Sequence, residues 1–155
     1  MGVNWQGVGV VNKLGLVLEV YCGENLSAFA RIVRLAEMFP SLTIVLNHCG
    51  LHIGPAFLSN PEIYPNLGAP EKLSQWRAGI ASLSPYENVI LKLGGIQMAS
   101  NGFGFDGQPT PPSSKAIAAQ TRKYYSHCLT SFGADRCMFE SNVSQGTPPS
   151  RLLGQ

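Results

Sequence analysis

Apolar and polar positions follow two different periods along this chain, and the change of period divides it into strand-like and helix-like segments. Short strand-like runs lie at about residues 14–21, 42–47, 88–93 and 136–140. Apolar residues at helical spacing lie within residues 26–39, 70–83 and 113–132. Strands that alternate with helices need crossover connections, so the pattern predicts an α/β fold with a mainly parallel sheet covered by helices.

The connections between these segments have unequal lengths. Residues 49–69 and 94–112 are long, follow strands and are rich in glycine, proline, asparagine and serine. The returns from helix to strand are much shorter, at residues 40–41 and 133–135. Long loops at one edge of the sheet and short turns at the other are typical of α/β enzyme scaffolds.

Polar residues and glycines stand where the predicted strands end. The second strand runs into Asn47 and His48, and the third runs into Gly94 and Gly95. In parallel α/β folds, ligands bind beyond the carboxyl ends of strands, so we predict one site there. His48 suits it because imidazole titrates near neutral pH and serves as a general base or a metal ligand. The alternative is a histidine hydrogen-bonded beneath a loop, without catalysis.

Length and composition limit the class of protein. The chain has 155 residues, enough for one domain but short of the roughly 250 residues that a complete (β/α)₈ barrel usually needs. Charged residues make up 13% of it, against about 25% in a typical domain. Either this is a small domain rich in glycine and proline, or part of its surface is covered by missing chain or by a partner.

Charge and cysteine patterns exclude several functions. The net charge is +2 without a basic run, so we expect no nucleic-acid partner. No apolar stretch reaches the length of a membrane span and no signal peptide is recognisable, so we expect no membrane partner and a cytoplasmic protein. The four cysteines lack CxxC spacing and are expected to be reduced and mostly buried.

Three stretches together resemble the amidohydrolase-related family, in its lactonase-like branch of TIM-barrel hydrolases. They are residues 39–50, 89–95 and 132–142, and residues 102–105 and 109–114 are also similar. The resemblance covers about residues 10–142. It implies a partial (β/α)₈ barrel that comprises about the last four strand–helix units. We therefore expect a partial barrel domain at residues 1–142 and a disordered tail at 143–155.

The resemblance also assigns roles to particular residues. His48 matches the histidine that the family uses in metal binding or water activation, and Asn142 stands where many members carry the aspartate of strand eight. We therefore predict His48 and Asn142 as catalytic residues, although an amide cannot be a general base. Glu19, Lys92 and Glu140 are predicted to bind substrate. An ion pair of Glu140 with Lys92 or Arg136 is the alternative for that carboxylate.

A divalent metal, zinc, is implied for the complete family fold. The HxH metal motif of the family does not occur in this chain, and residues 20–23 (Val-Tyr-Cys-Gly) replace the aromatic residue and histidine of relatives. His52 is expected to have a loop or solvent role, because glycines at 50 and 54 prevent a helix that would place it beside His48. We predict no metal in this chain and leave any metal ligands unknown.

Two functions from different classes follow. The first is a hydrolase of the amidohydrolase superfamily that acts on a small molecule, a lactone or a related cyclic ester or amide, through an activated water. The second is a catalytically inactive half-barrel or a small α/β binding module that needs a partner chain. A half-barrel would leave two edge strands uncovered, so we expect self-association through these edges.

Overall fold

The computed structural model describes residues 4–51, 53–105 and 108–140, and four parallel strands form its sheet. The strands are β1 (Leu18–Val20), β2 (Ile44–Leu46), β3 (Val89–Leu93) and β4 (Cys137–Phe139). They lie side by side in sequence order, and each neighbouring pair is parallel. This confirms the predicted sheet. The first strand is shorter than expected, since residues 14–17 precede it.

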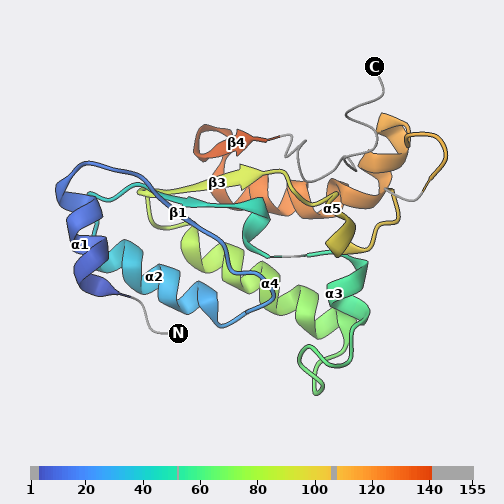
Figure 1. The fold of residues 1–155 in the computed structure, drawn as a ribbon, viewed down its shortest axis with the longest axis horizontal. Helices are drawn as coiled ribbons and strands as arrows, with labels where there is room; N and C mark the ends of the chain where they lie inside the picture. Colours follow the sequence, from blue (N-terminus) through green and yellow to red (C-terminus); the bar gives the residue numbers. More distant parts are fainter. Residues whose placement is uncertain (1–3, 52, 106–107, 141–155) are drawn as a thin grey trace.

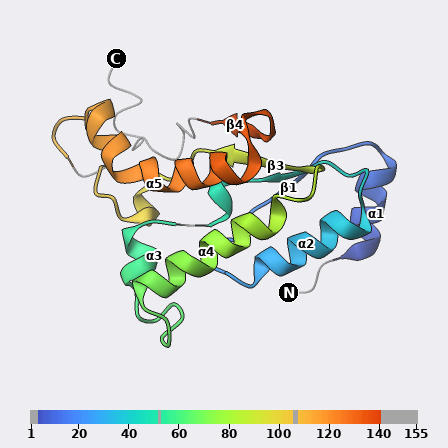
Figure 2. The same ribbon diagram turned by 180° about the vertical axis from the view of Figure 1, so that it is seen from behind.

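Helices pack against one face of this sheet. The α-helices are α1 (Trp5–Lys13), α2 (Ala28–Met38), α3 (Pro55–Ser59), α4 (Ala69–Leu83) and α5 (Ser114–Phe132). Short 3₁₀ turns occupy His48–Gly50, Ala99–Asn101 and Ala134–Arg136. Helices α2, α4 and α5 lie behind the sheet in Figure 1 and in front of it in Figure 2. These three are the helices that the sequence predicts.

Local capping explains where the helices begin and end. The Ser113 hydroxyl accepts a hydrogen bond from the backbone N–H of Ala116 at 3.2 Å, and α5 ends at Gly133, whose φ of 76° suits a residue without a Cβ. Helix α1 was not predicted, because Gly7 and Gly9 weaken its helical pattern. The side chain of Asn4 caps it by accepting from the N–H of Gly7 at 3.0 Å.

The hydrophobic core fills the space between the sheet and these helices. Its residues with no measurable exposure include Ile44, Leu46, Cys49, Ile53, Trp76, Ile80, Leu83, Val89, Leu91 and Cys128. They come from β2, β3, α4, α5 and the loop after β2, so one contiguous core joins these segments. Strand–helix repeats with four parallel strands confirm the predicted α/β partial barrel.

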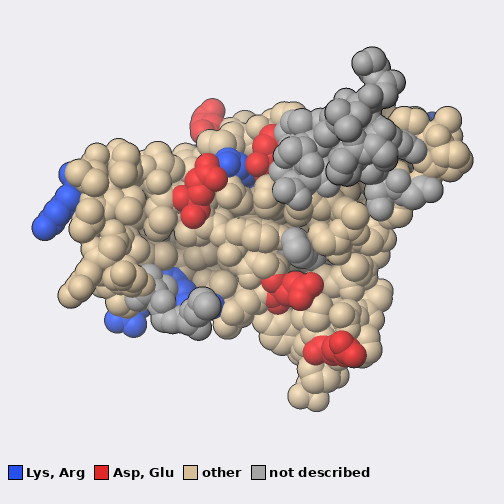
Figure 3. Space-filling model, in the orientation of Figure 1, with Lys and Arg blue, Asp and Glu red and all other residues tan. Residues whose placement is uncertain are grey.

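The opposite face of the sheet carries no helix among the described residues (Figure 1). Strand register places Glu19, Val45 and Ile90 in one row across this open face, and Lys92 lies two residues beyond Ile90. At the β4 edge, Met138 is 40% exposed and Phe139 is 83% exposed. Figure 3 shows that most of the visible surface is uncharged; one group of acidic and basic side chains lies over the sheet, and others are scattered away from it. None of the described helices has the length and hydropathy needed to cross a membrane.

Candidate active site

The side chains of His48 and Glu140 meet at the carboxyl end of the sheet. Nδ1 of His48 and Oε1 of Glu140 are in close hydrogen-bond contact, although 92 residues separate them in sequence. Both side chains are mostly buried, at 18% and 19% exposure. A carboxylate on Nδ1 holds the proton at that nitrogen and leaves Nε2 as the basic atom. The pair can therefore act as an oriented general base.

A left-handed turn directs His48 toward Glu140. Strand alternation places Asn47 on the open face and would send His48 to the helix-covered face. Instead, His48 and Cys49 both have φ of 53° and Gly50 has φ of 85°. Left-handed backbone costs roughly 1–2 kcal/mol per non-glycine residue, so this conformation must be stabilised by its surroundings.

Buried contacts hold this turn in place. The indole N–H of Trp76 donates to the carbonyl oxygen of Cys49 at 2.9 Å, and neither residue is exposed. The N–H of Gly50 donates to the carbonyl of Asn47 at 2.8 Å, and the N–H of Cys22 donates to the carbonyl of Gly50 at 3.0 Å. The turn is thereby bonded to β2, to the loop after β1 and to α4.

Two glycines after β3 leave room for the His48–Glu140 pair. A Cβ at Gly94 would overlap the side chain and carbonyl oxygen of Glu140, and a Cβ at Gly95 would overlap the imidazole of His48. Gly95 also has φ of 66°. The predicted glycine-rich strand end is therefore a steric requirement of the site.

A second polar cluster lies beside this pair on the open face. Nζ of Lys92 binds Oε1 of Glu19 at 2.8 Å, and Nδ2 of Asn47 donates to Oε2 of the same carboxylate at 3.0 Å. Hydrogen bonds from Lys92 and then from Asn47 lower the pKa of Glu19 below its ordinary value of 4.5. Glu19 therefore remains ionised at neutral pH.

Aromatic and thiol groups surround the site. The ring of Tyr21 meets the imidazole of His48 edge-on, with 5.2 Å between centroids. Burial raises the pKa of Tyr21 and raises that of Cys22 to about 12. A hydrogen bond with Cys49 and burial raise the pKa of Cys128. These groups stay protonated at neutral pH. Cys22, Cys49 and Cys128 are free and buried, as expected, and Cys137 is half-buried.

The structure brings four of the five predicted site residues to this edge: His48, Glu140, Glu19 and Lys92. The fifth, Asn142, lies outside the described residues, as do His52 and the tail at 143–155. The alternative ion pair of Glu140 is wrong, because Lys92 pairs with Glu19. Arg136 instead donates to the carbonyl oxygens of Tyr86 and Ser84, at 2.9 and 2.7 Å.

A metal ion does not fit the described part of the site. No three histidine, cysteine, aspartate or glutamate side chains in that part of the chain converge on a point that could hold one. Nδ1 of His48 already contacts Glu140, which leaves Nε2 as its single ligand atom. A catalytic zinc normally takes three protein ligands. The chemistry available to the described residues is therefore acid–base chemistry.

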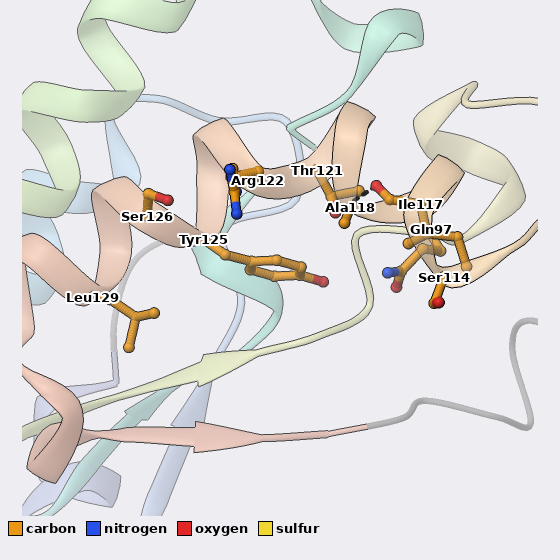
Figure 4. A pocket seen from close by; sticks show the side chains of 9 residues that line it. All are labelled: Gln97, Ser114, Ile117, Ala118, Thr121, Arg122, Tyr125, Ser126 and Leu129. Carbon is orange, nitrogen blue, oxygen red and sulfur yellow. Dashed lines mark hydrogen bonds between the residues drawn. The ribbon is translucent and has the colours of Figure 1, made fainter.

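A hollow of about 380 Å³ lies along α5. Gln97, from the loop after β3, lies beside Ser114 and Ile117 at one end of the hollow, and Leu129 lies at the other end (Figure 4). Burial is the main cause that raises the pKa of Tyr125, and the charge of Glu140 adds to it. Sequence reasoning misses this hollow, because most of its residues belong to the helical pattern of residues 113–132, which predicts packing positions.

Comparisons with known proteins agree with this architecture. The amidohydrolase family model matches residues 2–144, a wider range than the sequence resemblance. The uncharacterized protein y4mH of Sinorhizobium fredii is 27% identical over 110 residues, which cover 71% of this chain and 28% of that protein.

Solved structures are similar in fold. An amidohydrolase of Burkholderia multivorans with bound HEPES has a TM-score of 0.63 and 20% identity, and the match covers 96% of this chain and 44% of that one. A structure with bound zinc, also described as an amidohydrolase of Burkholderia multivorans, has a TM-score of 0.61 and 20% identity, with 97% and 44% covered. The chain thus spans less than half the length of these proteins. It belongs to the amidohydrolase family and forms part of the family's barrel.

Proposed function

We propose that this chain supplies the acid–base part of a hydrolase that opens a lactone or a related cyclic ester or amide. The single observation that carries the proposal is the contact between His48 and Glu140 at the carboxyl ends of the parallel strands. Family membership supports hydrolysis as the type of reaction. Because the chain covers 44% of its structural neighbours, the reaction belongs to a barrel completed by further chain.

The reaction step follows from the proton positions. With Nδ1–H donated to Glu140, Nε2 of His48 accepts a proton from a water molecule as that water attacks the carbonyl carbon of the lactone. The carboxylate of Glu140 stabilises the imidazolium that forms. The ring C–O bond then breaks, His48 returns the proton to the leaving oxygen, and a hydroxy acid is released. No oxidant, reductant or metal is needed for this balance.

Glu19 and Lys92 are proposed to bind the polar substituents of the substrate. Their ion pair lies on the open face beside His48, and the Glu19 side chain is 53% exposed. Asn47 orients the carboxylate of Glu19 through a 3.0 Å hydrogen bond. Glu140 was predicted to bind substrate as well, and its contact with His48 adds a role in orienting the base. Asn142 remains a proposed catalytic residue.

A substitution at His48 tests this function in a chain that contains the whole barrel. The transcript upstream of Met1 would reveal such a chain if it encodes a further strand in frame with an HxH motif. In that protein, His48→Ala should reduce turnover of γ- and δ-lactones by about a hundredfold or more, the usual contribution of a positioned base. Glu37→Ala is the control, because the exposed Glu37 carboxylate on α2 accepts a hydrogen bond from the hydroxyl of Tyr86 at 2.6 Å and contacts no residue of the proposed site in the described structure. Equal turnover in the two variants would contradict the proposal.

Exposed apolar side chains at the two edges of the sheet favour a second candidate, a half-barrel without activity of its own that binds a partner chain or a second copy. Phe139 is 83% exposed and Met138 is 40% exposed on edge strand β4, and Leu16 and Val17, just before edge strand β1, are each 54% exposed. We expect the 155-residue chain to bind zinc no more tightly than its His48→Ala variant, and to hydrolyse lactones no faster than buffer. Light scattering over a concentration series should show association. A monomer at all concentrations would contradict this candidate.

A further inference from the structure

We infer that Trp76 is a positioning residue for His48. Its indole lies in the core on α4, away from the open face, and has no measurable exposure. Its N–H donates to the carbonyl oxygen of Cys49, the residue directly after His48. Through this bond, a residue of the helix layer controls the direction of a side chain at the sheet's open face.

The backbone around His48 explains why this bond matters. His48 and Cys49 are non-glycine residues in left-handed conformation, which a free chain seldom adopts. In the extended conformation that precedes them at Asn47, His48 would follow strand alternation and point away from Glu140. The carbonyl of Cys49 is buried, and without the indole donor it would lose the hydrogen bond that it accepts in the left-handed turn.

Trp76 both fills the core and donates a hydrogen bond to the turn. Trp76 also meets Tyr124 edge-on, with 5.8 Å between ring centroids, so part of its role is to fill the core. Ile80 lies one turn later on the same helix and is equally buried, but its hydrocarbon side chain has no hydrogen-bond donor. The two residues are equally buried on α4, and only Trp76 has a side-chain donor. A substitution at each can therefore distinguish loss of the hydrogen bond from loss of packing.

The role rests on the proposed function of His48 as the base, but its test measures the geometry of the imidazole and not turnover. In the full 155-residue chain labelled with ¹⁵N-histidine, His48 should be mainly the Nδ1–H tautomer at a pH where the imidazole is neutral. Its signals are identified by their loss in His48→Gln. Failure of the lactonase assay would leave this measurement unaffected, so the two proposals can fail separately.

Trp76→Phe keeps an aromatic ring and removes the N–H donor. We expect the ratio of Nδ1–H to Nε2–H tautomers at His48 to fall about tenfold, because the imidazole is no longer held against Glu140. Ile80→Val should lower the denaturation midpoint and leave the ratio unchanged. An unchanged ratio in Trp76→Phe, or an equal fall in Ile80→Val, would overturn the inference and leave Trp76 as a packing residue.

A reciprocal measurement decides the question if Trp76→Phe does not fold. Coupling between two groups acts in both directions, so removal of the Glu140 carboxylate should loosen the turn and expose its hydrogen bonds. We expect Glu140→Ala to speed hydrogen exchange of the Trp76 indole proton several-fold, with the Trp5 indole proton as the internal reference. Unchanged exchange at Trp76 would show that the pair and the indole are independent, and would overturn the inference.

Discussion

The two faces of the sheet differ in solvent exposure: the helix-covered face buries apolar side chains, and the open face exposes charged ones. On the helix-covered face, Ile44, Leu46 and Leu91 have no measurable exposure. On the open face, the side chain of Glu19 is 53% exposed and that of Lys92 is 17% exposed. The covered face obtains its stability from burial of apolar surface, whereas the open face keeps ionised groups in contact with solvent.

The difference shows how the chain separates stability from chemistry. The apolar side chains of β2 and β3 can be buried because α2, α4 and α5 pack over them. The polar groups near His48 remain available because no described helix covers them. A site built on a well-packed layer can hold strained groups, and the left-handed backbone at His48 and Cys49 is such a case.

The largest expected effect is a loss of stability on the covered face. Leu46→Ala should reduce the free energy of unfolding by about 2–5 kcal/mol, because the site is fully buried and the deletion leaves a cavity. Met138→Ala on β4 should cost less than about 1 kcal/mol, since Met138 is 40% exposed. Denaturation with urea measures both. Similar losses would show that the open face is also buried in solution, against another chain.

Periodicity predicts most of this fold but not all of it. The four strands and helices α2, α4 and α5 follow from apolar spacing, since each buries a continuous stripe. Helix α1 contains Gly7 and Gly9, and α3 is only five residues long within a loop, so neither has a strong pattern. Helix α1 depends on the cap from Asn4, and α3 depends on Pro55 at its first position; both also depend on tertiary packing.

The sequence predicts which of the described polar residues lie together at this edge, but not how they pair. Strand ends identify His48, Lys92 and Glu140 as neighbours, because the carboxyl ends of parallel strands lie at one edge. The partner of Glu140 depends on the left-handed turn at His48, which alternation along a strand does not predict. The indole bond from Trp76 to Cys49 joins residues 27 apart and has no local sequence signal.

A smaller effect is expected at Gly94, which directly follows β3 and lies against Glu140. Its backbone does not have positive φ, so alanine is acceptable there, but the added Cβ would overlap Glu140. Gly94→Ala should cost about 1–3 kcal/mol of stability by overpacking and should also shift the His48 tautomer ratio. Gly9→Ala in α1 is the control, because the added Cβ would lie 3.9 Å from the nearest side chain, that of Phe39, and the substitution should stabilise by about 0.4–1 kcal/mol. A Gly94→Ala chain with wild-type stability and tautomer ratio would contradict the steric role.

The smallest expected effect concerns the pH dependence of the exposed pair between Glu19 and Lys92. Because the pKa of Glu19 is lower in the folded chain than its ordinary value of 4.5, the pair contributes stability above that value and loses it as the pH falls through the folded pKa. The melting temperature of the wild type should exceed that of Glu19→Gln slightly at neutral pH, and the difference should disappear in acid. Solvent screening keeps it small. In Lys92→Met, an NMR titration should show the pKa of Glu19 rising toward 4.5, because the hydrogen bond that lowers this pKa most is gone. A pKa that stays low in that variant would assign the shift to Asn47 instead.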